Sequence, residues 1–218
     1  MSDPSDVLTK VRRALGRTGP LATPPEPPPI DEVIARLVRS NESLAELFTT
    51  RATANKMYVE SVGSASLGEK LVEFFRKNNC RRVALSDSPL LEKMGIAAAL
   101  QQAGLEPHLW SSLSLDQLYD MDGAVTDVFA AVAETGSLVV RSTPQHGRAL
   151  SLVPPVHAAL VELGNLLPDL MDLFELLSKQ SNRAGLTIIS GPSKTADIEL
   201  NLVTGVHGPG VVKTFLLE

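Results

Sequence analysis

Residues 81–111, RRVALSDSPLLEKMGIAAALQQAGLEPHLWS, carry the pattern that decides the fold. The segment RRVALSDS predicts a strand, residues 90–104 predict a helix that ends on Gly104, and EPHLWS predicts a second strand. A strand, a helix and another strand in this order are typical of a parallel sheet whose connections run through helices. The stretch therefore predicts an α/β fold.

The same alternation precedes this stretch, because KMYVESV predicts a strand at residues 56–62 and residues 65–79 predict a helix. The second half of the chain has consecutive strand-like runs with little helix between them, including two around Pro154 and Pro155. We therefore expect an open mixed sheet flanked by helices. Further predicted elements are a helix over 166–182, a strand over 185–190, a short helix over 195–205 closed by Gly205, and a terminal strand over 210–217.

The N-terminal segment differs from the rest of the chain. Residues 1–17 predict a short amphipathic helix, and the proline-rich segment TGPLATPPEPPP at residues 18–29 predicts an extended spacer. A new helical pattern opens at Asp31. We therefore expect an N-terminal helix and linker over residues 1–30 and an α/β domain over residues 31–218. Either the spacer is a plain tether, or the first helix docks on a partner.

Composition excludes several classes of function. The net charge of −5 does not suit strong binding to nucleic acid, and no run of about 18 apolar residues predicts a membrane span. The single cysteine, Cys80, excludes a disulfide framework and an iron–sulfur cluster held by this chain's own thiolates, and it suits a reducing cytoplasm. No strand is followed by G-x-G-x-x-G, and the four histidines lack metal-ligand spacing, so we expect no cofactor and no metal.

Two glycine-containing segments are candidates for a site. In AVAETGSLVV, Glu134 and Thr135 lie in a polar break between apolar runs, and Gly136 allows either a turn or a close backbone approach. The break suits a small polar ligand or proton transfer, and equally a hairpin turn. In GVHGPG, His207 lies on a glycine-flanked turn and is either a group that titrates near neutrality or an exposed turn residue. His146, on a predicted loop, and His157, on a predicted strand, are weaker candidates for a functional site.

The segment SGPSKTADIE at residues 190–199 resembles a phosphate-binding loop but lacks the second glycine of that motif. Ser193 or Thr195 is expected to cap a helix whose first-turn amides, with Lys194, attract a carboxylate or phosphate. Acidic residues already complement that helix start, so ordinary capping remains an equal alternative.

Four motifs in this order, AETGSLVV, RALSLVPPVH, GPSKTADIE and GVHGPG, resemble the LUD (lactate utilisation) domain family, lactate utilisation protein C type, over residues 30–218. The resemblance implies an α/β fold similar to the CoA transferase, ribose-5-phosphate isomerase and glucosamine-6-phosphate deaminase superfamily. It also implies a place beside iron–sulfur partner proteins in the oxidation of L-lactate to pyruvate. It supplies no catalytic residues to carry over.

From the loop arrangement of that superfamily we expect AETGS and residues 191–197 to face each other across a cleft, with His207 nearby. Arg141 or Arg148 is expected to contact the carboxylate of a 2-hydroxy or 2-oxo acid. Candidate proton-transfer groups are Glu134, Asp197 and His207. Candidate ligand-binding residues are Thr135, Gly136, Ser137, Arg148, Gly191, Ser193, Lys194 and Thr195.

Three functions remain open at this point. The first is a subunit without a cofactor in a lactate-oxidising assembly that binds a small carboxylate or phosphate. The second is a self-sufficient enzyme of the isomerase or CoA-transferase kind. The third is a non-catalytic binding or regulatory module, which predicts that Glu134→Gln and Asp197→Asn leave growth on lactate intact.

Overall fold

The computed structural model describes residues 4–17, 28, 36, 38, 42–179, 185–196, 202–205 and 207–218. The chain divides into two units, residues 1–35 and residues 36–218. In the first unit, helix α1 spans Pro4–Ala14 and confirms the predicted N-terminal helix. Its apolar side chains Val7, Leu8 and Val11 are exposed. The domain boundary predicted between residues 30 and 31 lies outside the described residues and stays a prediction.

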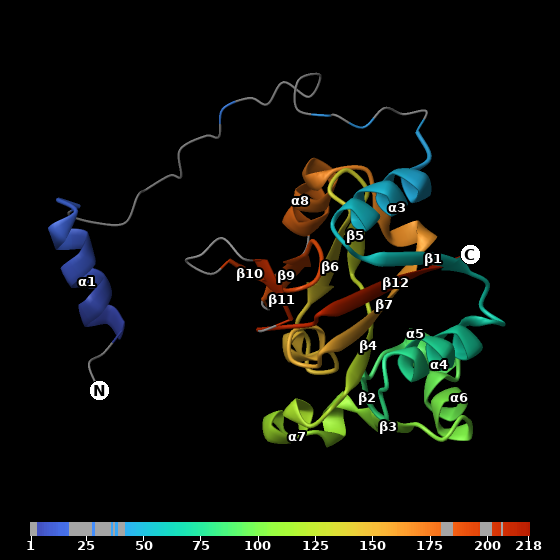
Figure 1. Ribbon diagram of the computed structural model, residues 1–218. Coiled ribbons are helices and arrows are strands. Elements are labelled where there is room, and N and C mark those ends of the chain that lie inside the picture. Colours follow the sequence, from blue (N-terminus) through green and yellow to red (C-terminus); the bar gives the residue numbers. More distant parts are fainter. Residues whose placement is uncertain are drawn as a thin grey trace. The chain divides into compact units, whose positions relative to one another are not determined.

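The second unit is built on a sheet of six parallel strands in the order β1-β12-β7-β4-β2-β3 (Figure 1). Between β2 and β3 the chain forms helices, which confirms the strand–helix–strand unit predicted over residues 81–111. The strands are β1 (Tyr58–Val62), β2 (Arg82–Leu85), β3 (Glu106–Leu109), β4 (Gly123–Asp127), β7 (Val156–Glu162) and β12 (Val211–Leu217).

A separate four-stranded sheet has the order β8-β5-β6-β9. The pairs β5–β6 and β6–β9 are antiparallel, whereas β5–β8 is parallel. The α/β class is therefore confirmed, but in place of the expected open mixed sheet there are a parallel sheet, a small mixed sheet and the two-stranded sheet β10-β11. The reason is local, because a tight turn after β5 returns the chain directly into β6. The strands are β5 (Ala130–Val132), β6 (Ser137–Arg141), β8 (Leu166–Leu167) and β9 (Leu186–Ile189).

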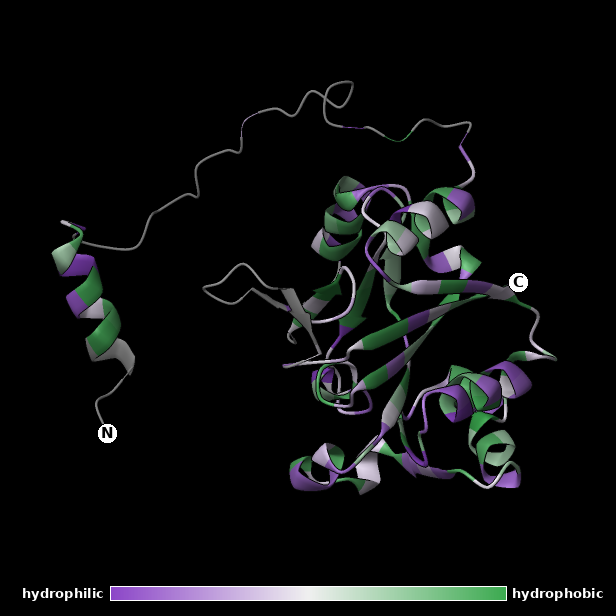
Figure 2. Cartoon of the chain, in the orientation of Figure 1, coloured by the Kyte–Doolittle hydropathy of each residue, from purple (hydrophilic) through white to green (hydrophobic). Residues whose placement is uncertain are grey.

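The six-stranded sheet is covered on both faces. On β7, Leu160 packs in one apolar cluster with Phe75 of α4, whereas Val161 packs in another with Leu138 of the small sheet. Figure 2 shows hydrophobic residues along these central strands and mixed colouring on the outer helices. A strand buried on both sides is largely apolar rather than alternating. The run VHAALV of β7 fits this pattern apart from His157. The helices are α3 (Leu44–Ala54), α4 (Leu67–Lys77), α5 (Pro89–Lys93), α6 (Ile96–Gln102), α7 (Leu115–Tyr119) and α8 (Leu170–Ser178).

Three predicted elements differ from the structure. The helix predicted over 90–104 is two helices, because Gly95 adopts a left-handed φ of 62° between α5 and α6. The strand expected before the two prolines is a 3-10 helix, η2 (Arg148–Ser151). The helix predicted over 195–205 is wrong, since β10 (Lys194–Ala196) and β11 (Leu202–Thr204) form an antiparallel pair there. The remaining 3-10 helices are η1 (Trp110–Ser112) and η3 (Leu163–Asn165).

The helical pattern that opens at Asp31 falls largely outside the described residues, and a described helix is present from Leu44. Within the described part of the chain, no helix combines the length and the apolar character needed to cross a bilayer.

The turn between β5 and β6 depends on Gly136. Its φ is 62°, and a Cβ atom there would lie 2.3 Å from the backbone nitrogen of Ala52 in α3. We predict that Gly136→Ala lowers the free energy of unfolding by about 2–4 kcal/mol, because the left-handed backbone and the overlap both oppose a side chain. Urea denaturation measures the loss. Gly63→Ala is the matched control, since nothing lies within 4 Å of that position. Equal stability of the two variants would contradict the close approach.

Candidate functional site

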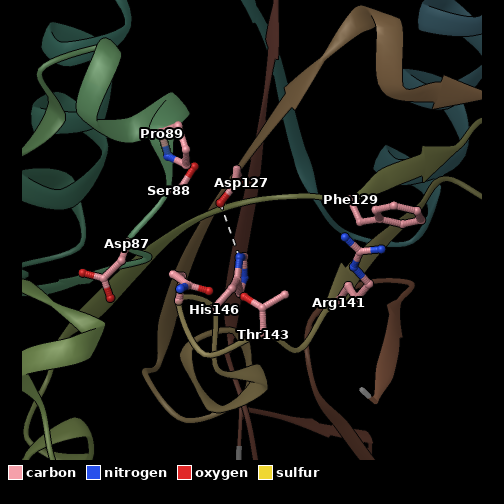
Figure 3. A pocket seen from close by; sticks show the side chains of 9 residues that line it. Asp87, Ser88, Pro89, Asp127, Phe129, Arg141, Thr143 and His146 are labelled. Carbon is pink, nitrogen blue, oxygen red and sulfur yellow. Dashed lines mark ion pairs between the residues drawn. The ribbon is translucent and has the colours of Figure 1, made fainter. Parts of the chain in front are cut away.

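A cavity of about 490 Å³ lies at the carboxyl ends of β2 and β4. The chain leaves β2 toward β3 on one side and leaves β4 toward β7 on the other. Neighbouring parallel strands whose connections diverge leave a crevice between them, and ligands of open α/β sheets bind there. The lining residues, shown in Figure 3, are Asp87, Ser88, Pro89, Asp127, Phe129, Arg141, Thr143, Gln145 and His146.

Asp127 ends β4 and pairs with His146 in the middle of this cavity (Figure 3). Its Oδ1 atom lies 3.3 Å from Nδ1 of His146 and accepts a hydrogen bond of 2.9 Å from Ser86 Oγ. Burial alone raises the pKa of Asp127, but the hydrogen bond and charge of His146, with hydrogen bonds from Ser86 and Ser88, outweigh it and lower the pKa overall. A carboxylate held ionised accepts hydrogen bonds and donates none, so Asp127 suits a ligand group that carries a proton.

The loop that carries His146 is anchored on both sides. Backbone hydrogen bonds of 3.0 and 3.1 Å join Thr143 and His146 in a tight turn. Trp110 Nε1 donates to the carbonyl of Pro144 at 3.1 Å, and a Cβ atom on Gly147 would lie 2.1 Å from the indole ring. These contacts hold the imidazole of His146 at the end of β4.

Asp87 has a different role from Asp127, because its carboxylate is already bonded. Its Oδ2 atom accepts from the backbone N–H of Ser111 at 2.8 Å, and Oδ1 accepts from the Ser111 hydroxyl at 2.9 Å. The backbone N–H of Asp87 donates to the carbonyl of Gln145 at 3.0 Å. Asp87 therefore ties the loop after β2 to η1 and to the His146 loop.

Arg141 provides the cation of the cavity. It ends β6, and its guanidinium carbon lies 4.6 Å above the centre of the Phe129 ring. In Figure 3 Arg141 and Phe129 occupy the side of the cavity opposite Ser88 and Pro89. A guanidinium presents a planar fork of donors that matches a carboxylate or phosphate. The cavity therefore combines a donor fork at one side with the Asp127 acceptor in its middle.

His157 is a core residue of β7. Its side chain is fully buried, and Nε2 lies 2.8 Å from the hydroxyl of Thr126. Burial, with a smaller effect of His146, lowers the pKa of His157 to about 3, so the ring is neutral at physiological pH. Among the described residues, Nδ1 of His157 and Nε2 of His146 are both buried without a hydrogen-bond partner.

The two segments expected to face each other lie side by side. Leu138 of β6 pairs with Ile189 of β9, and the hydroxyls of Ser137 and Ser190 are 2.7 Å apart. They are neighbouring strands of the small sheet, and the residues Glu134, Thr135, Gly136 and Ser137 do not line the 490 Å³ cavity.

Some of the predicted ligand residues do meet in a second, smaller cavity of about 240 Å³. Gly191, Ser193 and His207 line it, and Val212 places it near the amino end of β12. Since the 490 Å³ cavity lies at carboxyl ends of strands in the same parallel sheet, the two cavities are separate sites.

The remaining predicted residues are spread out. Lys194 begins β10 and is exposed, so the helix N-terminus expected to bind an anion there is wrong. The side chain of Thr195 and all of Asp197 lie outside the described residues. Arg148 is exposed at the start of η2 and lines neither of these two cavities.

Sequence reasoning missed Asp127 and Asp87 and gave His146 little weight. A signal was present, because polar residues follow directly after both buried strands, as SDS after β2 and Asp127 at the end of β4. Strand-end polar residues of a parallel sheet gather at one edge, whichever strands are neighbours. The place of His146 depends on contacts with Trp110, which no local pattern reveals.

Cys80 is buried, and burial, with a smaller effect of Asp122, raises the pKa of its thiol to about 12. Its Sγ atom lies 3.5 Å from the carbonyl of Asp122. No cluster of three or more histidine, cysteine, aspartate or glutamate side chains that could hold a metal occurs in the described part of the chain.

The family follows from comparison with known sequences. A profile of the LUD domain matches residues 45–217. The chain belongs to the LUD domain family. Lactate utilization protein C of Exiguobacterium sp. is 29% identical to this LUD domain protein, over 98% of this chain and 95% of the relative. The protein of the same name from Halalkalibacterium halodurans is 27% identical over 78% of this chain and 77% of the relative.

A crystal structure of a DUF162 family protein from Deinococcus radiodurans has the same fold. It superposes on this LUD domain chain with a TM-score of 0.61 at 20% identity, covering 87% of this chain and all of that one. At this identity the likeness concerns the fold alone.

The lowered pKa of Asp127 predicts an acid-sensitive contribution to stability. Its folded-state pKa lies below the unperturbed value of 3.8, so the unfolded chain takes up the proton first as the pH falls. The contribution is therefore present above about pH 5 and is lost as the pH falls through the folded-state pKa. We expect wild type to lose about 0.5–1 kcal/mol more than Asp127→Asn between pH 6 and pH 3, as pairs of this exposure do.

Urea denaturation at each pH measures this difference. The exposed Asp120→Asn is the control and should follow wild type. Parallel curves for wild type and Asp127→Asn would contradict the lowered pKa of Asp127.

The buried thiol predicts slow chemical labelling. With its pKa raised to about 12, Cys80 in the folded chain should react with a disulfide reagent at pH 8 at least about a hundredfold more slowly than in the urea-unfolded chain. Absorbance of the released thiolate follows both reactions. Equal rates would show that Cys80 is accessible.

Proposed function

We propose that this chain acts in lactate utilisation, as the ligand-binding subunit of a system that oxidises L-lactate to pyruvate with iron–sulfur partner proteins. The names of the LUD-domain relatives support the process. The observation that carries the proposal is the cavity at the ends of β2 and β4, where Arg141 and the Asp127–His146 pair line one space.

The two charged groups suit the two ends of a hydroxy acid. The Arg141 guanidinium holds the carboxylate through its donor fork. Asp127, whose pKa is lowered, accepts the proton of the hydroxyl group as a hydrogen bond. A 2-oxo acid carries no hydrogen at that oxygen, so Asp127 favours the hydroxy acid over the oxo acid.

The reaction divides between this chain and its partners. Oxidation of lactate releases two electrons and two protons, and the redox step needs an electron acceptor. The chain contains one cysteine, so the thiolate ligands of an iron–sulfur acceptor come from the partner proteins. In this scheme the chain binds and orients the acid, and the hydroxyl proton leaves through the Asp127–His146 pair. The hydrogen on C2 and the two electrons of the broken C–H bond pass to the electron acceptor of the partner proteins.

The cavity of about 240 Å³ supports a second candidate function. Gly191, Ser193 and His207 line it together, and the function weighed for this cavity is that of a self-sufficient enzyme of the isomerase or CoA-transferase kind. The likeness to that superfamily remains a prediction. Turnover of sugar phosphates or acyl-CoA by the isolated chain, lost in His207→Ala, would favour this second function.

Binding of L-lactate tests the proposal directly. By isothermal titration calorimetry we expect Arg141→Ala to weaken binding at least about tenfold, because a charge-assisted pair is lost. The exposed Arg148→Ala should bind as wild type does, and circular dichroism checks that each variant is folded. Weakening by Arg148→Ala alone would overturn the assignment of the carboxylate to Arg141.

The role in the assembly needs the partners. Lactate-dependent dye reduction by the reconstituted system should fall when this chain is omitted, and Asp127→Asn should not restore it. The same rate with and without the chain would refute the proposed function.

A further inference from the structure

A further cavity adjoins the cavity that contains Asp127, and its lining is more apolar. Its volume is about 470 Å³, and it shares Asp87 and Ser88 with the cavity that contains Asp127. It lies between β2, the end of β3 and the helices α5 and α6. Apart from the shared pair, most of its lining is aliphatic or small: Leu85, Leu91, Gly95, Ile96, Ala97, Ala98 and Leu109. We call it the apolar slot.

Three of the four polar side chains that line the apolar slot already have hydrogen-bond partners, and the first of them, the Ser86 hydroxyl, donates to Asp127 at 2.9 Å. The Asp87 carboxylate is bonded to Ser111, and the Ser88 hydroxyl accepts from the backbone N–H of Leu90 at 3.2 Å. Glu92 is the charged side chain that the slot adds to this pair, and it is exposed. Such a lining offers a ligand apolar contact rather than hydrogen bonds.

The charged and apolar groups follow one another in a fixed order along the two cavities. In Figure 3 Arg141 lies on the far side from Ser88, with Asp127 and His146 between them. Because Ser88 also borders the slot, the sequence along the combined space is donor fork, acceptor and then aliphatic wall. A 2-hydroxy acid has its groups in the same order, with the carboxylate first, the hydroxyl next and the carbon tail last.

We propose that this site takes 2-hydroxy acids whose aliphatic tail extends several carbons beyond that of lactate. The proposal rests on the proposed function for the places of the carboxylate and the hydroxyl. Two adjoining cavities of about 490 and 470 Å³ each fall in the range of pockets that enclose drug-sized ligands. A three-carbon acid fills the polar cavity in part and leaves the apolar slot without contacts, whereas a longer tail buries its methylene groups there.

Calorimetric titration with matched acids tests the proposal. The probes are L-lactate, L-2-hydroxyhexanoate and hexanoate, which lacks the hydroxyl group. We expect the wild type to bind L-2-hydroxyhexanoate at least about tenfold more tightly than L-lactate, since each buried methylene contributes about 0.8 kcal/mol. Hexanoate should bind more weakly than L-2-hydroxyhexanoate, because it offers Asp127 no donor.

A variant that fills the slot separates this proposal from a general preference for apolar acids. Ala98 is exposed at the slot, so Ala98→Phe is compatible with folding and should bring the affinity ratio of the two hydroxy acids close to one. Ala54→Phe, at an exposed alanine at the end of α3, is the matched control and should keep the wild-type ratio.

The outcomes distinguish the two proposals. A tenfold ratio in wild type that collapses in Ala98→Phe supports the assignment of the tail to the slot. Equal binding of both hydroxy acids, or a ratio that Ala98→Phe leaves unchanged, overturns this inference while lactate binding keeps the proposed function intact. Binding of none of the acids removes the proposed function and this inference with it.

Discussion

The parallel pairing of β2 with β4 positions the whole site. Val83 to Leu85 pair with Gly123 to Val125, and the chain then leaves the two strands in opposite directions. Gly123 also lets helix α4 pack closely on β4, because a Cβ atom there would lie 2.6 Å from the ring of Phe75. Had both connections run the same way, one loop would cover the other, and Asp127 and Ser88 would not share a cavity.

The inserted small sheet supplies the other half of the site. It branches from the main sheet after β4, and β6 ends at Arg141, just before the loop that carries His146. Asp127 therefore belongs to the parallel sheet, whereas its partner His146 and the cation Arg141 come from the insertion. The packing of Leu138 and Val140 against Ala159 and Val161 fixes the two sheets against each other and so sets the distance between the charges.

The elements with a clear local period could be predicted from the sequence, with one period misjudged, whereas strand order and contacts between distant segments could not. The α/β alternation through residues 81–111 was predicted, because each element there has its own period. The segment after Lys194 was predicted to be a helix, although TADIELNL alternates polar and apolar residues with the period of a strand. AETGS and residues 191–197 were expected to face each other across a cleft, whereas the strands beside them are neighbours in the small sheet. The meeting of Asp127 with His146 depends on strand order, which local sequence does not encode.

Trp110 links the fluorescence of the protein to the turn that carries His146. It is the single tryptophan of the chain, and its indole N–H bonds Pro144 while its ring lies against Gly147. Indole emission responds to the polarity around the ring and to the groups that it contacts. All tryptophan fluorescence of the protein therefore originates beside the turn that carries His146, so the molecule contains a native optical reporter of that turn without any label.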